Sequence, residues 1–277
     1  MSVDSLGLRS AASEPDHALA RFWLWVAAAL SLLLAAGAGS RLVGFDSHAY
    51  WLVWHHGDVY GLAPNQQDAF VYSPAFAQLL WPLAQLPWPL FAAIWTAAGL
   101  AVYAWLLWPL DWRWRGPLLL LCAPQALVGN IWPVFAVVAV FGFRRAELWA
   151  VPLLTKVTAG VGLVWFAARH EWRSLLRAAL ATGAVVAVSV AISPGLWFDW
   201  LHLLTGGGRA GTPAGAWNVP LVFRLPLALG LAVYAAKRNR PAVLVATIGL
   251  ASPVFTLSWL LSWLVPLAAL PRLRREY

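Results

Sequence analysis

Long apolar runs, separated by short polar or basic segments, make up almost the whole chain after residue 20. A helix needs roughly 20 apolar residues to cross the hydrocarbon core of a membrane. Four runs are close to that length, at about residues 22–39, 88–109, 178–193 and 219–236. The pattern predicts an all-α fold, a polytopic transmembrane helical bundle.

Three further apolar runs are interrupted near the middle by polar residues or by a proline. The interruptions are Gly129-Asn130, Thr155-Lys156 and Ser252-Pro253. Each run is interpreted as a hairpin of two short helices, which gives about ten membrane helices, several of them short and broken. Such short helices cannot cross a full bilayer alone, so neighbouring protein or a wet cavity must shelter them. The runs are 117–143, 148–168 and 241–270.

Most of the 19 basic residues sit in short clusters between the apolar runs. If every cluster is cytoplasmic, as the positive-inside rule requires, both termini are cytoplasmic and two long loops are extracytoplasmic. These loops are residues 40–73 and 194–218, the second of which has a flexible, glycine-rich sequence. Residues 1–20 are expected to be a disordered cytoplasmic tail, and 21–277 a single transmembrane domain. The clusters include Arg113/Arg115, Arg144/Arg145, Arg169/Arg173/Arg177 and Lys237/Arg238/Arg240.

Composition supports a membrane protein, because 61% of the 277 residues are hydrophobic and only 11% are charged. Soluble domains carry about 25% charged residues. The net charge of +8 follows the topology signals, so it gives no reason to expect nucleic-acid binding. Cys122 is the single cysteine, which excludes disulfides within the chain and cysteine-based metal sites. Arginine outnumbers lysine 17 to 2 and alanine is abundant, which resembles a high-GC bacterial genome and favours the bacterial inner membrane.

The first long loop concentrates residues that can carry chemistry. Asp46 directly precedes residues 47–57, a stretch with helical potential. Aromatic residues lie along one side of this stretch, as expected for an amphipathic helix at the membrane interface. Asp46 could cap that helix, or it could act as a general base toward an acceptor hydroxyl. Histidine and aspartate also permit a metal site, but their spacing matches no strong zinc pattern, and no cofactor is indicated. The other candidates here, for acceptor or sugar binding, are His48, Tyr50, Trp51, Trp54, His55, Asp58 and Tyr60.

Lys156 lies inside an apolar run between Thr155 and Thr158. A lysine at a helix end can extend its ammonium group to the membrane surface. A lysine buried in a span instead faces a partner or a cavity, where it attracts an anion such as a lipid phosphate. Tyr72 and a nearby amide, Asn130, are candidates to assist it.

Four segments in this order resemble glycosyltransferase family 87, which includes polyprenyl-phosphate-mannose-dependent α-mannosyltransferases of actinobacteria. The first is the acidic Gly44-Phe-Asp-Ser47 after the first span, and the second is the helix start Phe70-Val-Tyr-Ser-Pro-Ala-Phe76. The third is the Gly129-Asn130 break, and the fourth is Leu153-Leu-Thr-Lys156 followed by a basic cluster. The resemblance runs from about residue 20 to 270.

The resemblance implies a GT-C fold and an inverting hexosyl transfer from a polyprenyl-phosphate sugar on the extracytoplasmic face. Mannose is the first candidate sugar, and a lipid or a cell-envelope glycan is the acceptor. Asp46 would be the catalytic base, and Lys156 would hold the donor phosphate.

Two departures from the family keep other functions open. The chain is shorter than typical members, and the stretch from Ser252 to Trp259 lacks the histidine that relatives carry after their Ser-Pro. A non-catalytic GT-C-like subunit that binds polyprenyl lipid is therefore one alternative. A lipid or solute transporter is another, disfavoured because no acid is plainly embedded in the spans beside Lys156.

Overall fold

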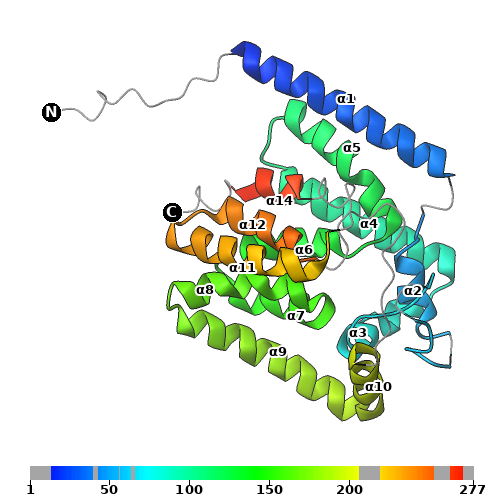
Figure 1. Cartoon of the computed structure of the whole chain (residues 1–277). Helices are drawn as coiled ribbons and strands as arrows, with labels where there is room; N and C mark the ends of the chain where they lie inside the picture. Colours follow the sequence, from blue (N-terminus) through cyan, green and yellow to red (C-terminus); the bar gives the residue numbers. More distant parts are fainter. Residues whose placement is uncertain are drawn as a thin grey trace.

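The computed structural model describes residues 14–39, 43–55, 57–63, 66–205, 219–252 and 263–270. Within these ranges all regular structure is helical, as the hydrophobic pattern predicts (Figure 1). The fold is a bundle of long and short helices, most of which run in roughly the same direction (Figure 1).

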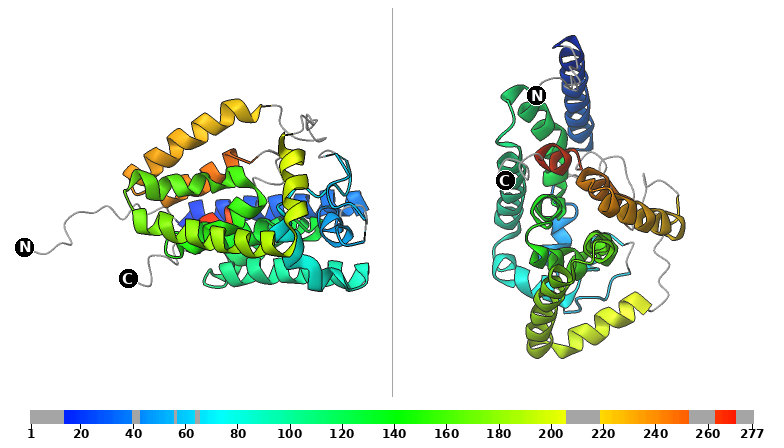
Figure 2. Two further views of the ribbon diagram at one scale, coloured as in Figure 1. Left: turned by 90° about the horizontal axis from the view of Figure 1, so that it is seen from below. Right: turned by 90° about the vertical axis from the view of Figure 1, so that its left-hand side faces the viewer.

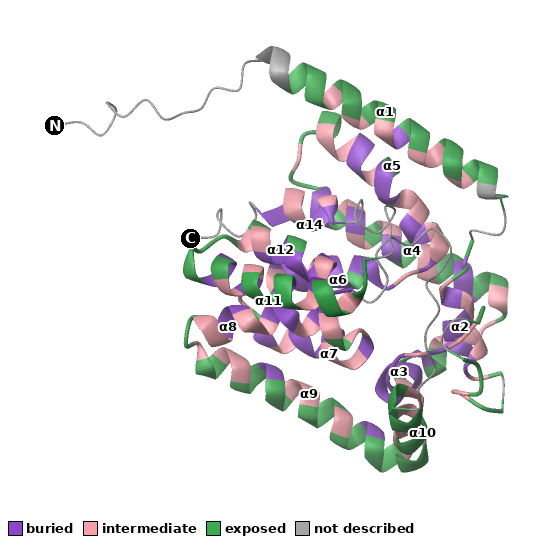
Figure 3. Ribbon diagram, viewed as in Figure 1, coloured by how far each residue is buried: buried purple, intermediate pink, exposed green. Residues whose placement is uncertain are grey.

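Three helices of the described part are long and apolar enough to cross a membrane: α1 (Glu14–Ala38), α4 (Trp88–Leu107) and α9 (Trp172–Ile192). Large apolar side chains stand exposed along their outer faces, for example Leu33 at 70% and Val188 at 63% (Figure 3). Because such faces are unfavourable in water, they indicate contact with lipid. The predicted spans at 22–39, 88–109 and 178–193 are confirmed as helices. The first, however, begins at Glu14, so residues 14–20 are helical and are not part of a disordered tail.

The predicted interruptions are found as breaks between short helices. The run 117–143 divides at Gly129 into α5 (Trp112–Val128) and α6 (Trp132–Phe141). The run 148–168 divides at Lys156, with α7 (Ala150–Thr155) before it and the 3-10 helix η4 (Val157–Leu163) after it. η3 (Ala146–Trp149) precedes α7, and α8 (Val164–Ala168) follows η4.

The last part of the bundle consists of α11 (Leu221–Lys237), α12 (Pro241–Leu250) and α14 (Leu264–Ala269). α12 ends two residues before Ser252, where a break is predicted, while Pro253 and the histidine-free stretch after it lie outside the described residues. About ten membrane helices are expected from the sequence. Three of the described helices are long enough to cross a membrane alone, so the total number of spans stays a prediction.

Three shorter helices gather at one end of the bundle: α2 (Ser47–Leu52), α3 (Pro74–Ala84) and α10 (Pro194–Thr205) (Figure 1). α2 is shorter than the 47–57 stretch with helical potential. α10 corrects the expectation of a flexible loop for the described part of 194–218, because its twelve residues form a helix that runs across the end of α9 (Figures 1 and 2). Residues 206–218 lie outside the described ranges.

Basic connections gather at the opposite end, where α4 meets α5, α8 meets α9, and α11 meets α12 (Figure 1). Side-chain contacts tie these clusters together. Arg169 donates to the carbonyl of Ala236 and to Asn239, at 3.3 and 3.4 Å, and Arg177 lies 3.5 Å from Glu147. The bundle therefore has a basic end and an acidic end, and the latter carries Asp46, Asp58, Asp68 and Asp199 on or beside α2, α3 and α10.

Trp149 shows how tightly the short helices pack. Its side chain is 1% exposed, and its indole N–H donates to the carbonyl of Gly142 at 3.1 Å. A Cβ atom added to Gly162 would lie 1.8 Å from the Trp149 ring, so only glycine fits there. This contact fixes η4 against η3, and with it the chain on the far side of Lys156.

Candidate active site

A short strap of main chain holds Asp46 against the end of α5. The N–H of Gly44 donates to the carbonyl of Leu127 at 2.7 Å, and the N–H of Asp46 donates to that of Val128 at 2.8 Å. The strap needs glycine on both sides, because Gly44 and Gly129 have φ of +75° and +78°. A Cβ on Gly129 would lie 2.2 Å from the Ser47 hydroxyl. We call residues 44–46 the Gly44–Asp46 strap.

The Asp46 side chain does not cap α2, although Asp46 occupies the residue before that helix. Its φ and ψ are −84° and −36°, and its carboxylate makes no capping hydrogen bond. The side-chain amide of Asn130 instead donates to Asp46 Oδ2 at 2.5 Å. The capping role considered from the sequence is therefore wrong, and the carboxylate is directed toward the break between α5 and α6.

Lys156 approaches the same break from another part of the chain. Its φ and ψ of −125° and 81° are not helical, so the helix breaks at Lys156 between α7 and η4. The ammonium nitrogen lies 3.4 Å from Asn130 Oδ1 and 4.3 Å from the centre of the Trp132 ring. A desolvated cation over an aromatic face is stabilised by the ring quadrupole. Asn130 thus bridges the two charged groups, because it donates to the Asp46 carboxylate and accepts from the Lys156 ammonium group.

The Asp46 carboxyl is poised for proton transfer by opposing influences. Burial raises its pKa above the ordinary value, while the positive charge of Lys156 and the hydrogen bond from Asn130 lower it. A carboxylate whose pKa burial raises is a stronger base than one in water, and the cation and the hydrogen-bond donor beside it favour its ionised form. The site therefore brings a carboxyl group that could act as a base close to a lysine ammonium group.

Two buried tyrosines lie beside this group. The hydroxyls of Tyr50 and Tyr72 are 3.0 Å apart, and both side chains are nearly inaccessible. Burial and the nearby negative charge of Asp46 raise the pKa of each phenol, so both remain protonated hydrogen-bond donors. Tyr60 closes the arrangement from outside, because its hydroxyl donates to the Tyr72 carbonyl at 2.9 Å.

A family model for glycosyltransferase family 87 matches residues 70–275. The chain belongs to glycosyltransferase family 87. Tyr72, Asn130 and Lys156 fall within the matched residues of this family 87 glycosyltransferase, whereas Asp46 precedes them. No curated protein and no solved structure matches the chain.

The remaining predicted residues of this family 87 glycosyltransferase form an outer layer around α2. His48 Nδ1 lies 2.8 Å from Asp68 Oδ1, and His55 stacks on Trp51 with ring centres 4.0 Å apart. His55 is exposed and His48 half-buried, so both can meet a ligand from outside. Asp58 accepts from the N–H of Tyr60 at 3.0 Å and thereby shapes its own turn.

Trp51 and Trp54 also fasten the first loop to α3 and to the turn that follows it. The Trp51 indole donates to the carbonyl of Leu86, and the Trp54 indole to that of Ala77, each at 2.8 Å. His56 lies outside the described residues. Within the described part, no three His, Cys, Asp or Glu side chains gather closely enough to hold a metal ion.

Three features of the site were not found from the sequence. They are the Trp132 ring under Lys156, the Asp68 partner of His48, and a hydrogen bond of 3.2 Å from the Trp200 indole of α10 to the Val71 carbonyl. The position of Trp132, two residues after the Asn130 break, was an available signal. The other two depend on contacts between loops that no local pattern encodes.

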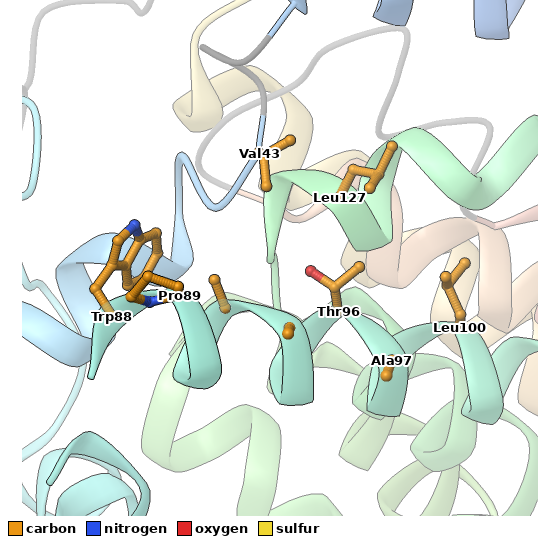
Figure 4. A pocket seen from close by; sticks show the side chains of 9 residues that line it. Val43, Trp88, Pro89, Thr96, Ala97, Leu100 and Leu127 are labelled. Carbon is orange, nitrogen blue, oxygen red and sulfur yellow. The ribbon is translucent and has the colours of Figure 1, made fainter. Parts of the chain in front are cut away.

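An apolar groove of about 490 Å³ opens along α4 beside the strap (Figure 4). One wall is α4 itself, and the other is built by Val43 and Leu127 (Figure 4). Apart from the Thr96 hydroxyl and the indole N–H of Trp88, the side chains that line it are hydrocarbon. The lining residues on α4 are Trp88, Pro89, Ala92, Ala93, Thr96, Ala97 and Leu100.

Proposed function

We propose that this glycosyltransferase moves a sugar from a polyprenyl-phosphate donor to a lipid or cell-envelope glycan acceptor, with inversion. Mannose is the first candidate sugar. The observation that carries the proposal is the array of Asp46, Asn130 and Lys156, which places a base and a cation on either side of one amide. Membership of family 87 supports the reaction class.

The reaction we propose is a single displacement. Asp46 accepts the proton of an acceptor hydroxyl, the hydroxyl oxygen bonds to the anomeric carbon, and the bond from that carbon to the phosphate oxygen breaks. The positive charge of Lys156 stabilises the phosphate as it leaves, with Tyr72 as a further donor. Asn130 holds both charged groups in place. His48, Tyr50, Trp51, Trp54, His55, Asp58 and Tyr60 are proposed to surround the acceptor.

Asn130 keeps the two charged groups close to each other. Its two hydrogen bonds, at 2.5 and 3.4 Å, hold Asp46 Oδ2 and Lys156 Nζ within about 8 Å. A base and a leaving-group stabiliser held this close can act on one sugar, as the proposed single displacement requires.

The proposed location is the bacterial inner membrane, in a GT-C-like bundle with cytoplasmic termini and an extracytoplasmic site. Basic residues collect at the end opposite the site, as expected if that end faces the cytoplasm. The sequence argument against a transporter needs correction, because Lys156 does have an acidic neighbour in Asp46. Family membership, and not an isolated lysine, is what favours an enzyme.

The decisive experiment is sugar transfer by the full chain reconstituted in lipid nanodiscs. Polyprenyl-phosphate mannose is offered first and the arabinofuranose donor second, with and without EDTA. We expect Asp46→Asn to abolish transfer. Asp111→Asn is the matched control, because Asp111 is exposed and caps α5, and asparagine can cap equally well. Transfer that survives in Asp46→Asn would remove Asp46 as the base, while no transfer from any donor by folded wild type would favour the non-catalytic subunit.

A further inference from the structure

The groove along α4 has the dimensions of a lipid chain. From Trp88 to Leu100, α4 rises about 18 Å at 1.5 Å per residue. That length is comparable to the depth of one leaflet, since the whole hydrocarbon core is about 30 Å thick. α4 is one of the three described helices that can cross a membrane, so the groove runs along the bilayer normal and not across it.

Small side chains create the space. Ala92, Ala93 and Ala97 lie on the groove face of α4, and Ala93 and Ala97 are exposed (Figure 4). The described lining offers a ligand almost only hydrocarbon. Its occupant must therefore be an apolar chain that enters sideways from the membrane.

The end of the groove at Trp88 meets the candidate active site. Val43 lies in the same turn as Asp46, and Leu127 provides the carbonyl that binds the strap. The Trp88 ring packs on the strap at Gly44, where an added Cβ would lie 2.5 Å from the indole. It also contacts His48, with ring centres 4.7 Å apart. The Trp88 end of the groove therefore lies against the strap that carries Asp46, so a chain that fills the groove has its head group on the side of the candidate active site.

We propose that the groove binds the hydrocarbon chain of a lipid acceptor and thereby presents the acceptor's head-group hydroxyl to Asp46. The proposal rests on the proposed function and narrows its acceptor to a lipid. The acceptor is favoured over the donor because Val43, which forms part of the groove wall, directly precedes the Gly44–Asp46 strap that carries the proposed base. Lys156, the proposed partner of the donor phosphate, is hydrogen-bonded to the other end of the Asn130 amide from Asp46.

Two alanines of α4 provide a matched test. Ala93→Phe places a ring in the groove, whereas Ala98→Phe places the same ring about 180° away from the groove's centre, on the opposite face of the helix. Both positions are exposed, so neither change disturbs buried packing. The probes are methyl mannoside and dodecyl mannoside as acceptors, which share a sugar and differ only in the chain.

For Ala93→Phe in nanodiscs, we expect the KM for dodecyl mannoside to rise about tenfold or more, with the KM for methyl mannoside unchanged. Ala98→Phe should change neither value, although dodecyl mannoside partitions into the nanodisc bilayer equally for both variants. A KM for dodecyl mannoside that Ala93→Phe leaves unchanged would overturn the proposal, while leaving the enzyme intact. A rise in the KM of the polyprenyl-phosphate donor alone would assign the groove to the donor chain and also overturn it.

A second readout does not require transfer. Dodecyl mannoside carrying a diazirine in its chain is photolysed with the protein, and the labelled peptides are mapped by mass spectrometry. Labelling concentrated on residues 88–100, reduced by Ala93→Phe and not by Ala98→Phe, supports the groove even if no donor supports transfer. Labelling spread equally over the lipid-facing helices, and indifferent to Ala93→Phe, contradicts it.

Discussion

Replacing Asn130 with alanine tests whether this amide sets the basicity of Asp46. Burial raises the pKa of Asp46, and the Asn130 hydrogen bond is one of two influences that lower it. Removing the amide therefore raises this pKa further. Because the base must be ionised to accept a proton, the acid limb of the pH–rate profile should move to higher pH.

The size of the effect follows from the strength of the bond. A hydrogen bond to a charged group contributes about 1.5–3 kcal/mol, and about 1.4 kcal/mol corresponds to a factor of ten. On the acid limb, kcat/KM should fall on the order of ten- to a hundredfold. Above the limb, where Asp46 is ionised in both proteins, the loss should be smaller.

The assay is the initial rate of sugar transfer against pH, measured at low donor and acceptor concentrations for kcat/KM. Asn239→Gly at the basic end is the control, since Asn239 lies in the turn after α11, far from the site (Figure 1), and glycine keeps its φ of +51°. Lys156→Met should move the limb in the same direction, because it removes the other lowering influence, and should also raise the KM of the donor. An acid limb that stays in place in Asn130→Ala, with an equal loss at every pH, would refute this account of Asn130.

Two further predictions concern packing. Gly162→Ala should lower the unfolding temperature, because the new methyl group overlaps the Trp149 indole; the loss corresponds to about 1–3 kcal/mol. Gly183→Ala in α9 is the control, because a methyl group there meets nothing within 4 Å. It should leave the unfolding temperature unchanged or raise it. Trp200→Phe should reduce the rate of sugar transfer several-fold, because it removes the hydrogen bond to the Val71 carbonyl next to Tyr72. Trp197→Phe should not, because the Trp197 indole donates to Ser189 where α9 meets α10. Equal losses in both variants would show that α10 acts only through general stability.

The helical fold class and the breaks between short helices could be predicted because each depends on residues that are close together in the sequence. A lysine or an asparagine inside an apolar run is unfavourable in a continuous lipid-facing helix, so Asn130 and Lys156 mark interruptions wherever the chain finally places them. The basic clusters could be placed at one end for a similar reason. Each of these inferences uses residues close together in the chain.

The meeting of Asp46 with Asn130 could not be derived in this way, because 84 residues separate them. Only the docking of the strap onto α5 brings the two side chains together. α10 was missed for a different reason, since the glycine-rich sequence that follows it suggested a flexible loop over the whole segment. The helix-starting Pro194 and the two tryptophans at helical spacing were the signals that favoured a helix.

The two hydrogen bonds of the Gly44–Asp46 strap are made by main chain on both sides. Substitution of a side chain leaves such bonds in place, provided that the glycines at the turns remain. The exposed residues of the first loop can therefore drift while the carboxylate keeps its position. If His55 and Asp58 contact the acceptor, as proposed, changes around them alter the choice of acceptor without moving the carboxylate. The fold thus separates the part of the molecule that evolution can vary from the part that it must keep.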